Sequence, residues 1–420
     1  MLKTVLGDEA EILQERDFQV LMLANMLAPL STSLLSPILD SLIDPFGAST
    51  ANIGLLISAV TAPAIITIPV AGLLADRLGR KPILVVSLFL YSIFGVAIAF
   101  TTNFTIVLIL RSLQGVAFGG LTPVIITALG DVYAGATEAT AQGVRFAGSG
   151  LVQTGFPLLA GGLLLFSWRF PFLIYAIGVP ISVIVALWFK DPTHDTDQSG
   201  QQRDDSGGEP KFKLIWKLIC TPRNASLIIA RGLPIMIWIG FITYNSIIVV
   251  RLLDGTPTQA GVLVAIASIA YAAGATQAGR VTTVFKTRFY PLIGTNVCLG
   301  AGFAIFLFAP VLVLAGVGVI IMGFGFGLSL SLYRSIITGL AGEALRGSIV
   351  SVAESFSRLI ATITPVAIGL VIGFLEQTMG LRSAVQFAGL SIGAISVFGG
   401  LLCLVSARLS ASSPRSTRLQ

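Results

Sequence analysis

Histidine is almost absent from this chain of 420 residues, and cysteine is scarce. The one histidine, His194, lies in a polar stretch, which argues against histidine-based acid–base catalysis and against a histidine-ligated metal. Cys220, Cys298 and Cys403 lie in or beside apolar segments at unrelated spacings, so they indicate neither a disulfide framework nor a zinc site. The sequence also contains no G-x-x-x-x-G-K-[ST] phosphate loop. We therefore expect no enzyme, no metal site and no cofactor.

Charge is the second scarcity, because only 11% of the residues are charged, whereas 55% are hydrophobic and the mean hydropathy is +0.90. Soluble domains carry about 25% charged residues, so the composition predicts an all-α polytopic membrane protein. One membrane crossing takes about 20 apolar residues, and the chain divides into about twelve such segments. We expect helices near 18–40, 53–75, 82–101, 105–129, 141–166, 169–190, 224–250, 257–283, 288–308, 311–334, 346–373 and 383–407.

A polar stretch rich in Gly, Ser, Gln and Asp interrupts the apolar segments in the middle of the chain. This composition is typical of a disordered linker, and it divides the helices into two sets of six. The predicted parts are an N-terminal tail, a six-helix bundle, a linker, a second six-helix bundle and a C-terminal tail, at 1–17, 18–190, 191–213, 214–407 and 408–420.

The two bundles resemble each other when the first is shifted by 208 residues, which superimposes the second helix on the eighth and the fourth on the tenth. Glycine and proline positions then coincide, which favours an internal repeat. The coinciding pairs are Gly115 with Gly323, Gly119 with Gly327, Pro157 with Pro365, and Gly161 with Gly369.

The distribution of basic residues predicts the topology. Only Arg169, Arg251 and Arg382 fall on the expected outer side, so the positive-inside rule places both termini in the cytoplasm. The sequence pI of 9.4 thus reflects topology and does not indicate a nucleic-acid partner. The short loops are typical of a prokaryotic plasma-membrane protein, in which membrane lipids surround the chain.

A charged turn between the second and third segments carries the most specific motif. It reads G-x-x-x-D-R-x-G-R-K, and its members are Gly72, Asp76, Arg77, Gly79, Arg80 and Lys81. The spacing resembles the signature loop of the major facilitator superfamily, which implies two six-helix bundles that alternate access to one site without ATP. The resemblance also implies a conformational switch in which Asp76 caps the eleventh helix and Arg80 pairs with an acid at the base of the fourth, here Asp131. In the second bundle Val284 stands where the shift places Asp76, so we expect the first copy to dominate.

Arg111 lies inside the fourth predicted helix, where a buried charge costs roughly 2.5–3.5 kcal/mol or more. Together with Gln114 and Gly115 it resembles the superfamily's R-x-x-Q-G pattern, and the resemblance implies a role in proton coupling or substrate contact. The alternative is a structural arginine that donates hydrogen bonds to carbonyls of neighbouring helices.

The fifth predicted helix contains Gly155, Pro157, Gly161 and Gly162. This run resembles the superfamily's antiporter motif, although Phe156 separates the first glycine from the proline. The resemblance implies export. Plain packing of small residues between helices is the alternative explanation.

The eleventh predicted helix contains two charges four residues apart, Glu354 and Arg358, which share a face. Mutual neutralisation explains the pair, and the alternative is that Glu354 carries protons. Asp40, near the outer end of the first helix, is a second coupling candidate. For Arg145 and Arg231, near cytoplasmic helix ends, we expect side chains that reach the lipid headgroups.

Few polar groups lie in the helices that border the cavity in the superfamily, and such an apolar wall suits a lipophilic solute. The sequence therefore favours proton-coupled export of lipophilic small molecules or drugs by a monomer, similar to the drug:proton antiporter branch of the superfamily. Uptake of a sugar or organic anion by symport or uniport stays open, as does a membrane sensor that transports nothing. The cavity candidates are Asn25, Gln114, Gln153, Trp238, Tyr244 and Asn245.

Overall fold

The computed structural model describes residues 7–133, 135–191, 218–285, 289–340 and 343–411. These residues form helices and no strand, so the all-α fold that the composition predicts is confirmed. Of the predicted linker 191–213, only Asp191 lies within the described residues. Residues 1–6 and 412–420 of the predicted tails also lie outside them.

Nine helical segments of the described chain are long and apolar enough to cross a membrane. One of them, Val352–Ser410, contains two helices, because the backbone of Gly380 turns with a φ of 78°. The 29-residue helix α9 (Gly135–Leu163) and the broken first hydrophobic stretch are not among the nine. Together these segments are consistent with the twelve that the sequence predicts.

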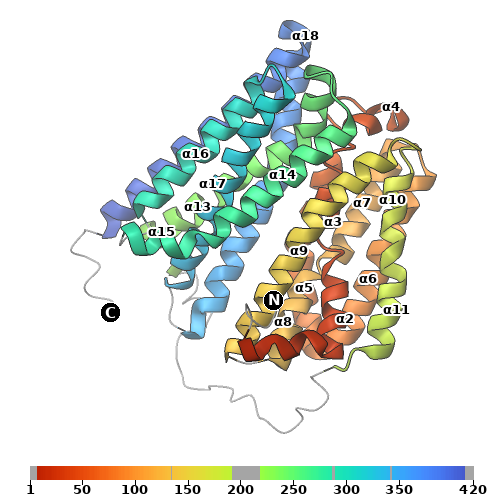
Figure 1. The fold of residues 1–420 in the computed structure, drawn as a ribbon, viewed down its shortest axis with the longest axis vertical. Coiled ribbons are helices and arrows are strands. Elements are labelled where there is room, and N and C mark those ends of the chain that lie inside the picture. The colour runs from red at the N-terminus through yellow and green to blue at the C-terminus, as the bar shows by residue number, and fades with distance from the viewer. Residues whose placement is uncertain (1–6, 134, 192–217, 286–288, 341–342, 412–420) are drawn as a thin grey trace. The chain divides into compact units, whose positions relative to one another are not determined.

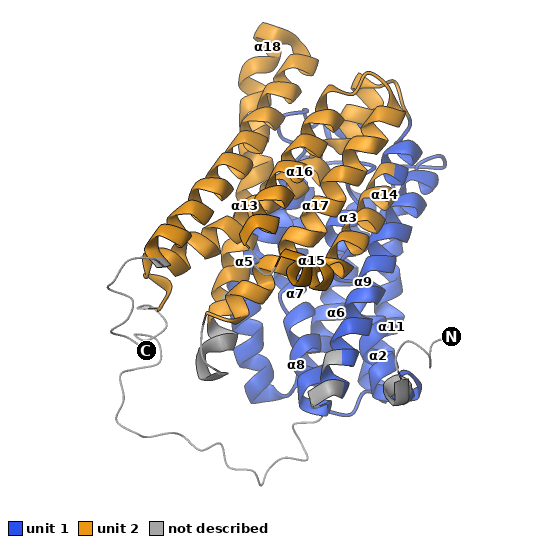
Figure 2. Ribbon diagram, turned by 60° about the vertical axis from the view of Figure 1, so that its left-hand side comes forward, with its two compact units in different colours: residues 1–202, 256–262 blue, residues 203–255, 263–420 orange. Residues whose placement is uncertain are grey.

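The chain forms two compact units, which Figure 2 colours separately. Unit 1 consists of residues 1–202 and 256–262, and unit 2 of residues 203–255 and 263–420. The short segment 256–262 therefore packs with unit 1, although the preceding residues 203–255 belong to unit 2. The sequence did not predict this assignment.

Unit 1 is a bundle whose long helices run side by side (Figure 1). Helix α5 packs against α7, α6 against α11, and α2 against α8, α9 and α11. The helices are α2 (Arg16–Asn25), α3 (Leu30–Ser33), α4 (Ile43–Phe46), α5 (Leu55–Leu78), α6 (Arg80–Ala97), α7 (Phe104–Phe118), α8 (Thr122–Val132), α9, α10 (Phe170–Leu173) and α11 (Gly178–Trp188).

The first hydrophobic stretch is not the single helix that we predict over 18–40. Helix α2 ends at Asn25, α3 follows only at Leu30, and turns occupy the rest. Pro29 and Pro37 lie within this stretch. Proline has no N–H group to donate to the preceding turn and its ring crowds the backbone there, so the helix is interrupted.

Unit 2 is built around α18, which packs against α13, α16 and α17. The break at Gly380 falls between the predicted helices 346–373 and 383–407 and confirms that separation. Helices α16 and α17 approach closely, since a Cβ atom on Gly302 would lie 2.4 Å from the Met322 nitrogen. The helices are α13 (Pro222–Ile247), most of α14 (Pro257–Thr276), α15 (Ala278–Phe285), α16 (Phe289–Phe308), α17 (Leu312–Thr338) and α18 (Glu343–Ala411).

Candidate functional site

The predicted signature loop is a tight turn between two long helices of unit 1. Helix α5 ends at Leu78, and α6 begins at Arg80. Gly79 between them has a φ of 94°, a backbone region that glycine enters without steric cost. Gly72 and the exposed Arg77 lie on the last turns of α5. The turn therefore explains why the motif has glycine at position 79.

Arg80 connects the loop to the base of α8. Its Nε donates a hydrogen bond of 3.0 Å to Asp131 Oδ2, and its Nη1 pairs with Asp76. The predicted ion pair between Arg80 and Asp131 is confirmed. Asp76 forms an ion pair with Arg80. The expected capping of the eleventh helix by Asp76 stays a prediction.

One partner of the loop was missed by the sequence analysis. The backbone N–H of Lys81 donates a hydrogen bond of 2.8 Å to Asp191 Oδ2. An acidic side chain there satisfies a free donor in the first turn of α6 and favours the positive end of the helix dipole. Asp191 is 110 residues away in sequence, so no local pattern identifies it.

Arg111 is fully buried on α7 and has neutral neighbours. Its Nη1 donates to Gln114 Oε1 at 2.8 Å and to the Tyr175 hydroxyl at 3.3 Å. The Tyr175 hydroxyl donates in turn to the Leu30 carbonyl at 3.1 Å. The guanidinium carbon lies 5.6 Å from the ring centroids of both Phe172 and Tyr175, close enough for cation–π attraction.

The hydrogen bonds of Arg111 go to side chains, whereas the structural alternative predicts bonds to carbonyls. Two of its donor atoms, Nε and Nη2, have no hydrogen-bond partner among the described residues. A buried donor without an acceptor costs about 1–3 kcal/mol, so these atoms have a strong preference for an acceptor from outside the chain. Gln114, a predicted cavity residue, instead holds the arginine and donates to the Tyr91 carbonyl.

The glycines of α9 differ in their surroundings. A Cβ atom on Gly161 would lie 2.8 Å from the Pro257 carbonyl oxygen, and Thr258 Oγ1 donates to the Gly161 carbonyl at 3.2 Å. Residues 256–262 belong to the same unit, so Gly161 permits close packing inside unit 1. Beside Gly155 and Gly162 there is open space within 4 Å. The packing explanation of the motif therefore applies to one of the paired glycines.

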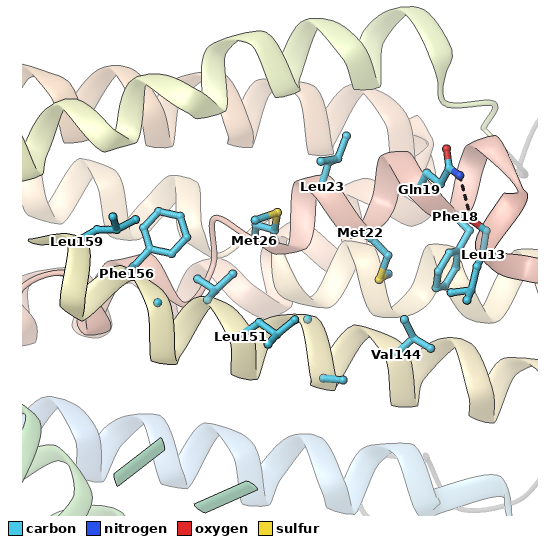
Figure 3. A pocket seen from close by; sticks show the side chains of 14 residues that line it. Leu13, Phe18, Gln19, Met22, Leu23, Met26, Val144, Leu151, Phe156 and Leu159 are labelled. Carbon is cyan, nitrogen blue, oxygen red and sulfur yellow. Dashed lines mark hydrogen bonds between the residues drawn. The ribbon is translucent and has the colours of Figure 1, made fainter. Parts of the chain in front are cut away.

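An apolar groove of about 700 Å³ lies between α2 and α9 (Figure 3). In Figure 3 the side chains of both helices point into it, and the Gln19 side chain is turned back to donate to the Leu13 carbonyl. Its walls are almost entirely aliphatic, aromatic or methionine side chains. The labelled lining residues are Leu13, Phe18, Gln19, Met22, Leu23, Met26, Val144, Leu151, Phe156 and Leu159.

The predicted cavity residues do not line this groove. Asn25 is buried and ties α2 to α9 by donating to the Arg145 carbonyl at 3.1 Å, and Gln153 donates weakly to the preceding turn of α9. Tyr244 and Asn245 are buried inside unit 2. The expectation that Arg145 reaches the headgroups is wrong, because its side chain is only 4% exposed.

Arg231 is likewise buried, at 4% exposure, and does not reach out as we expect. Its guanidinium forms an ion pair with Glu354 and donates to Ser357 Oγ at 2.6 Å and to the Ala353 carbonyl at 2.9 Å. Glu354 thus has an arginine partner on another helix. Its expected partner Arg358 lies one turn further along α18, and the pairing of Glu354 with Arg358 stays a prediction.

Three aromatic rings form a cluster in unit 2. Trp238 on α13 stacks on Phe326 of α17 with centroids 4.8 Å apart, and Tyr271 on α14 lies 5.6 Å from Phe326. Trp238, a predicted cavity residue, is therefore part of an aromatic cluster.

Asp40 is the remaining coupling candidate. Asp40 is half-buried and opens a short 3-10 turn, Asp40–Leu42. Within the described part of the chain, no three His, Cys, Asp or Glu side chains are grouped so that they would hold a metal ion.

The comparisons with known proteins identify the family. The family model of the Major Facilitator Superfamily matches residues 21–365, so the chain belongs to this family. The quinolone resistance protein NorA of Staphylococcus aureus (strain MRSA252) is 28% identical over 49% of this chain and 52% of NorA. The bacillibactin exporter of Bacillus subtilis (strain 168) is 29% identical over 35% of this chain and 38% of that protein. The chain thus aligns with about half the length of these curated relatives or less.

Solved structures share the fold at low sequence identity. A bacterial homologue of the human lysosomal transporter Spinster, in an inward-facing and occupied conformation, has a TM-score of 0.77 at 18% identity. That likeness covers 96% of this chain and 98% of the other. The D-xylose–proton symporter has a TM-score of 0.67 at 14% identity over 90% of this chain and 96% of its own. Likeness at this identity establishes the fold alone.

Proposed function

Since the chain belongs to the Major Facilitator Superfamily and is a membrane transporter, we propose that it exports amphipathic, largely apolar small molecules in exchange for protons. Alternating access around a site near the bilayer midplane is the mechanism that this fold supports. Two relatives are named a quinolone resistance protein and a bacillibactin exporter, and these names support export rather than uptake.

The apolar groove between α2 and α9 is the observation on which this proposal depends. A volume of about 700 Å³ is within the range of small-molecule sites, and its side chains offer area but few hydrogen bonds. A sugar needs many hydrogen-bond partners, because each buried hydroxyl without one costs free energy. The groove therefore suits a lipophilic body.

Arg111 supplies the coupling element of the proposal. Its Nε and Nη2, which have no hydrogen-bond partner in the described part of the chain, are available to an acidic group of the substrate or to a polarised water. An uncompensated charge in the membrane interior is costly. When Arg111 binds an acceptor, the conformational state that allows this binding is therefore stabilised relative to the other state. Tyr175 positions the guanidinium through the hydrogen bond to Nη1.

The test uses the full chain in proteoliposomes with an acidic lumen and a lumenal pH dye. Addition of a lipophilic substrate outside is expected to raise the lumenal pH, because protons leave as the substrate enters. Arg111→Ala is expected to abolish this response, with Arg169→Ala on an exposed turn as the matched loss of charge.

Each other result has a defined meaning. Solute entry without proton movement would contradict coupling and indicate a uniporter. A fall in lumenal pH on substrate addition would indicate symport, and therefore uptake. Binding without any flux would contradict transport and favour a sensor.

A further inference from the structure

The first described residues of the chain lie at one end of the apolar groove. A 3-10 helix, Gly7–Gln14, packs against both α2 and α9, the two helices that form the walls of the groove. Leu13 of this helix is itself a lining residue. In Figure 3 Leu13 lies at the same end of the groove as Phe18, and Leu159 lies at the opposite end. Residues 7–17, the N-terminal strap, therefore cover one end of the groove.

The strap depends on the bundle for its position. A 3-10 helix has poorer hydrogen-bond geometry than an α-helix, so runs longer than about four residues are uncommon. The run in the strap has eight residues. Ile12, which is only 3% exposed, anchors it by packing, and Gln19 Nε2 donates a hydrogen bond of 2.9 Å to the Leu13 carbonyl. Such a segment is released when its contacts with the bundle are lost.

Glu15 bonds the strap to α8. The hydroxyl of Tyr133, one residue beyond the end of α8, donates a hydrogen bond of 2.6 Å to Glu15 Oε2. Burial and the Glu15 carboxylate raise the pKa of Tyr133, so the hydroxyl stays protonated and remains the donor. The Tyr133 ring also lies edge-on to Phe18, with centroids 6.1 Å apart. Because hydrogen bonds to a charged group are stronger than neutral ones, we name the Glu15–Tyr133 bond the latch.

Two helix ends connect the strap to the charged turn between α5 and α6. At each of them one residue bonds to the strap, and a residue one or two positions away bonds to the turn. Residues so close in the chain move together, so a movement of the strap changes the surroundings of the turn. The bonds are Glu15–Tyr133 and Arg80–Asp131 at the end of α8, and Asp17–Lys190 at 3.0 Å and Lys81–Asp191 at 2.8 Å beyond the end of α11.

We propose that the N-terminal strap is a gate of the apolar groove, which opens when the latch between Glu15 and Tyr133 breaks and which the Arg80–Asp131 ion pair helps to hold shut. Since Leu13 of the strap lines the groove, a molecule that enters from this end has to displace the strap. The inference rests on the proposed transport function, in which the groove holds the lipophilic body, and adds the regulation of that site.

Thiol labelling measures access to this end of the groove independently of transport. Met22 lines the groove near the strap (Figure 3), so Met22→Cys is introduced into the full chain after its three native cysteines are replaced by serine. The protein in nanodiscs then reacts with a water-soluble sulfonated maleimide. Tyr133→Phe is expected to raise the labelling rate about tenfold, the value of one hydrogen bond to a charged group. Leu159→Cys, at the opposite end, is the matched control and keeps its rate.

Substitutions of the acids assign the effect to the latch. Glu15→Ala removes the acceptor and is expected to raise labelling of Met22→Cys as Tyr133→Phe does, whereas Glu15→Gln keeps an oxygen acceptor and raises it less. Glu11→Ala, which removes an exposed acid of the strap, is the control of equal charge and leaves the rate unchanged. Unfolding midpoints show that the variants remain folded.

The connection to the charged turn has a test of its own. Asp131→Asn is expected to raise labelling of Met22→Cys by itself and to add little in the Tyr133→Phe background, because the gate is then already open. Independent, multiplicative effects of the two substitutions would contradict the part of the inference that links the strap to the turn.

Two results would overturn the gate. One is unchanged labelling of Met22→Cys in both Tyr133→Phe and Glu15→Ala, which would make the latch a purely structural contact. The other is an equal rise at Met22→Cys and Leu159→Cys, which would indicate a loosened bundle.

Proteoliposome flux of the neutral lipophilic probe N-phenyl-1-naphthylamine keeps the failure of this inference separate from that of the proposed function. Proton-coupled flux of the probe, with no effect of the latch variants on labelling, contradicts the gate and leaves export standing. Latch-dependent labelling without any flux of the probe supports the gate and contradicts the transport function.

Discussion

The two units hold their buried arginines in different ways. In unit 1, Arg111 is surrounded by an amide, a hydroxyl and two aromatic rings, and two of its donor atoms have no partner among the residues that the structure describes. In unit 2, Arg231 is bonded to a carboxylate, a hydroxyl and a carbonyl. A neutral surrounding leaves an arginine ready for an acceptor from outside, whereas a carboxylate fixes it in place. The comparison indicates that Arg231 is a positioning residue and that Arg111 is available for function.

The largest effect on stability is expected for Arg231→Ala. It removes the ion-pair partner of the partly exposed Glu354 carboxylate and the donor to Ser357 Oγ, which is expected to lower the free energy of unfolding by about 2 kcal/mol. The double variant Arg231→Ala with Glu354→Gln should recover part of this loss, because the residue at position 354 then carries no charge. Thermal unfolding in detergent measures the stability of both variants. Equal losses in the two would contradict the claim that the Glu354 carboxylate fixes Arg231 in place.

The second largest loss of stability is expected for Gly161→Ala, which tests the packing of α9 against residues 256–262 in unit 1. The added methyl group would lie 2.8 Å from the Pro257 oxygen and Thr258 Cα, so we expect a loss of about 1–2 kcal/mol. Gly162→Ala is the matched control, since its Cβ would meet open space. The same loss in both variants would show that helix conformation, and not this contact, governs the site.

Tyr175→Phe tests how unit 1 positions Arg111. It removes the hydroxyl that accepts from Arg111 and donates to the Leu30 carbonyl, at an expected cost of about 1 kcal/mol. Because the guanidinium then loses its orientation, substrate-driven proton movement should slow by more than the stability loss explains. The lumenal pH assay measures this, with the surface variant Tyr290→Phe as control. Unchanged coupling would mean that Gln114 alone positions Arg111.

Asp131→Asn is expected to change stability least, by less than about 1 kcal/mol, because the ion pair with Arg80 is partly exposed. Its effect should appear in the transport rate, since an ion pair that exists in one state biases the equilibrium between states. Asp76→Asn should act in the same direction. Wild-type transport rates in both variants would remove the loop from the switching mechanism.

The sequence predicted some of these contacts and missed others for a physical reason. Arg80 and Asp131 were predictable, because both charges lie at the same ends of helices whose order hydropathy establishes. The pairing of Arg111 with Gln114 is local, at a separation of three residues on one helix. Arg231 was misread, because a basic residue ten positions into an apolar helix carries no sign of whether it reaches out or packs inward.

The sequence by itself determined the helical membrane fold, the separation into two sets of helices and the charged turn, since hydropathy and turn chemistry act over a few residues. Only the tertiary structure decided which polar groups meet. Tyr175 and Arg111 are 64 residues apart, and Arg231 and Glu354 are 123 residues apart. Helix packing brings them together, and the rotation of each helix about its axis decides which side chains face inward.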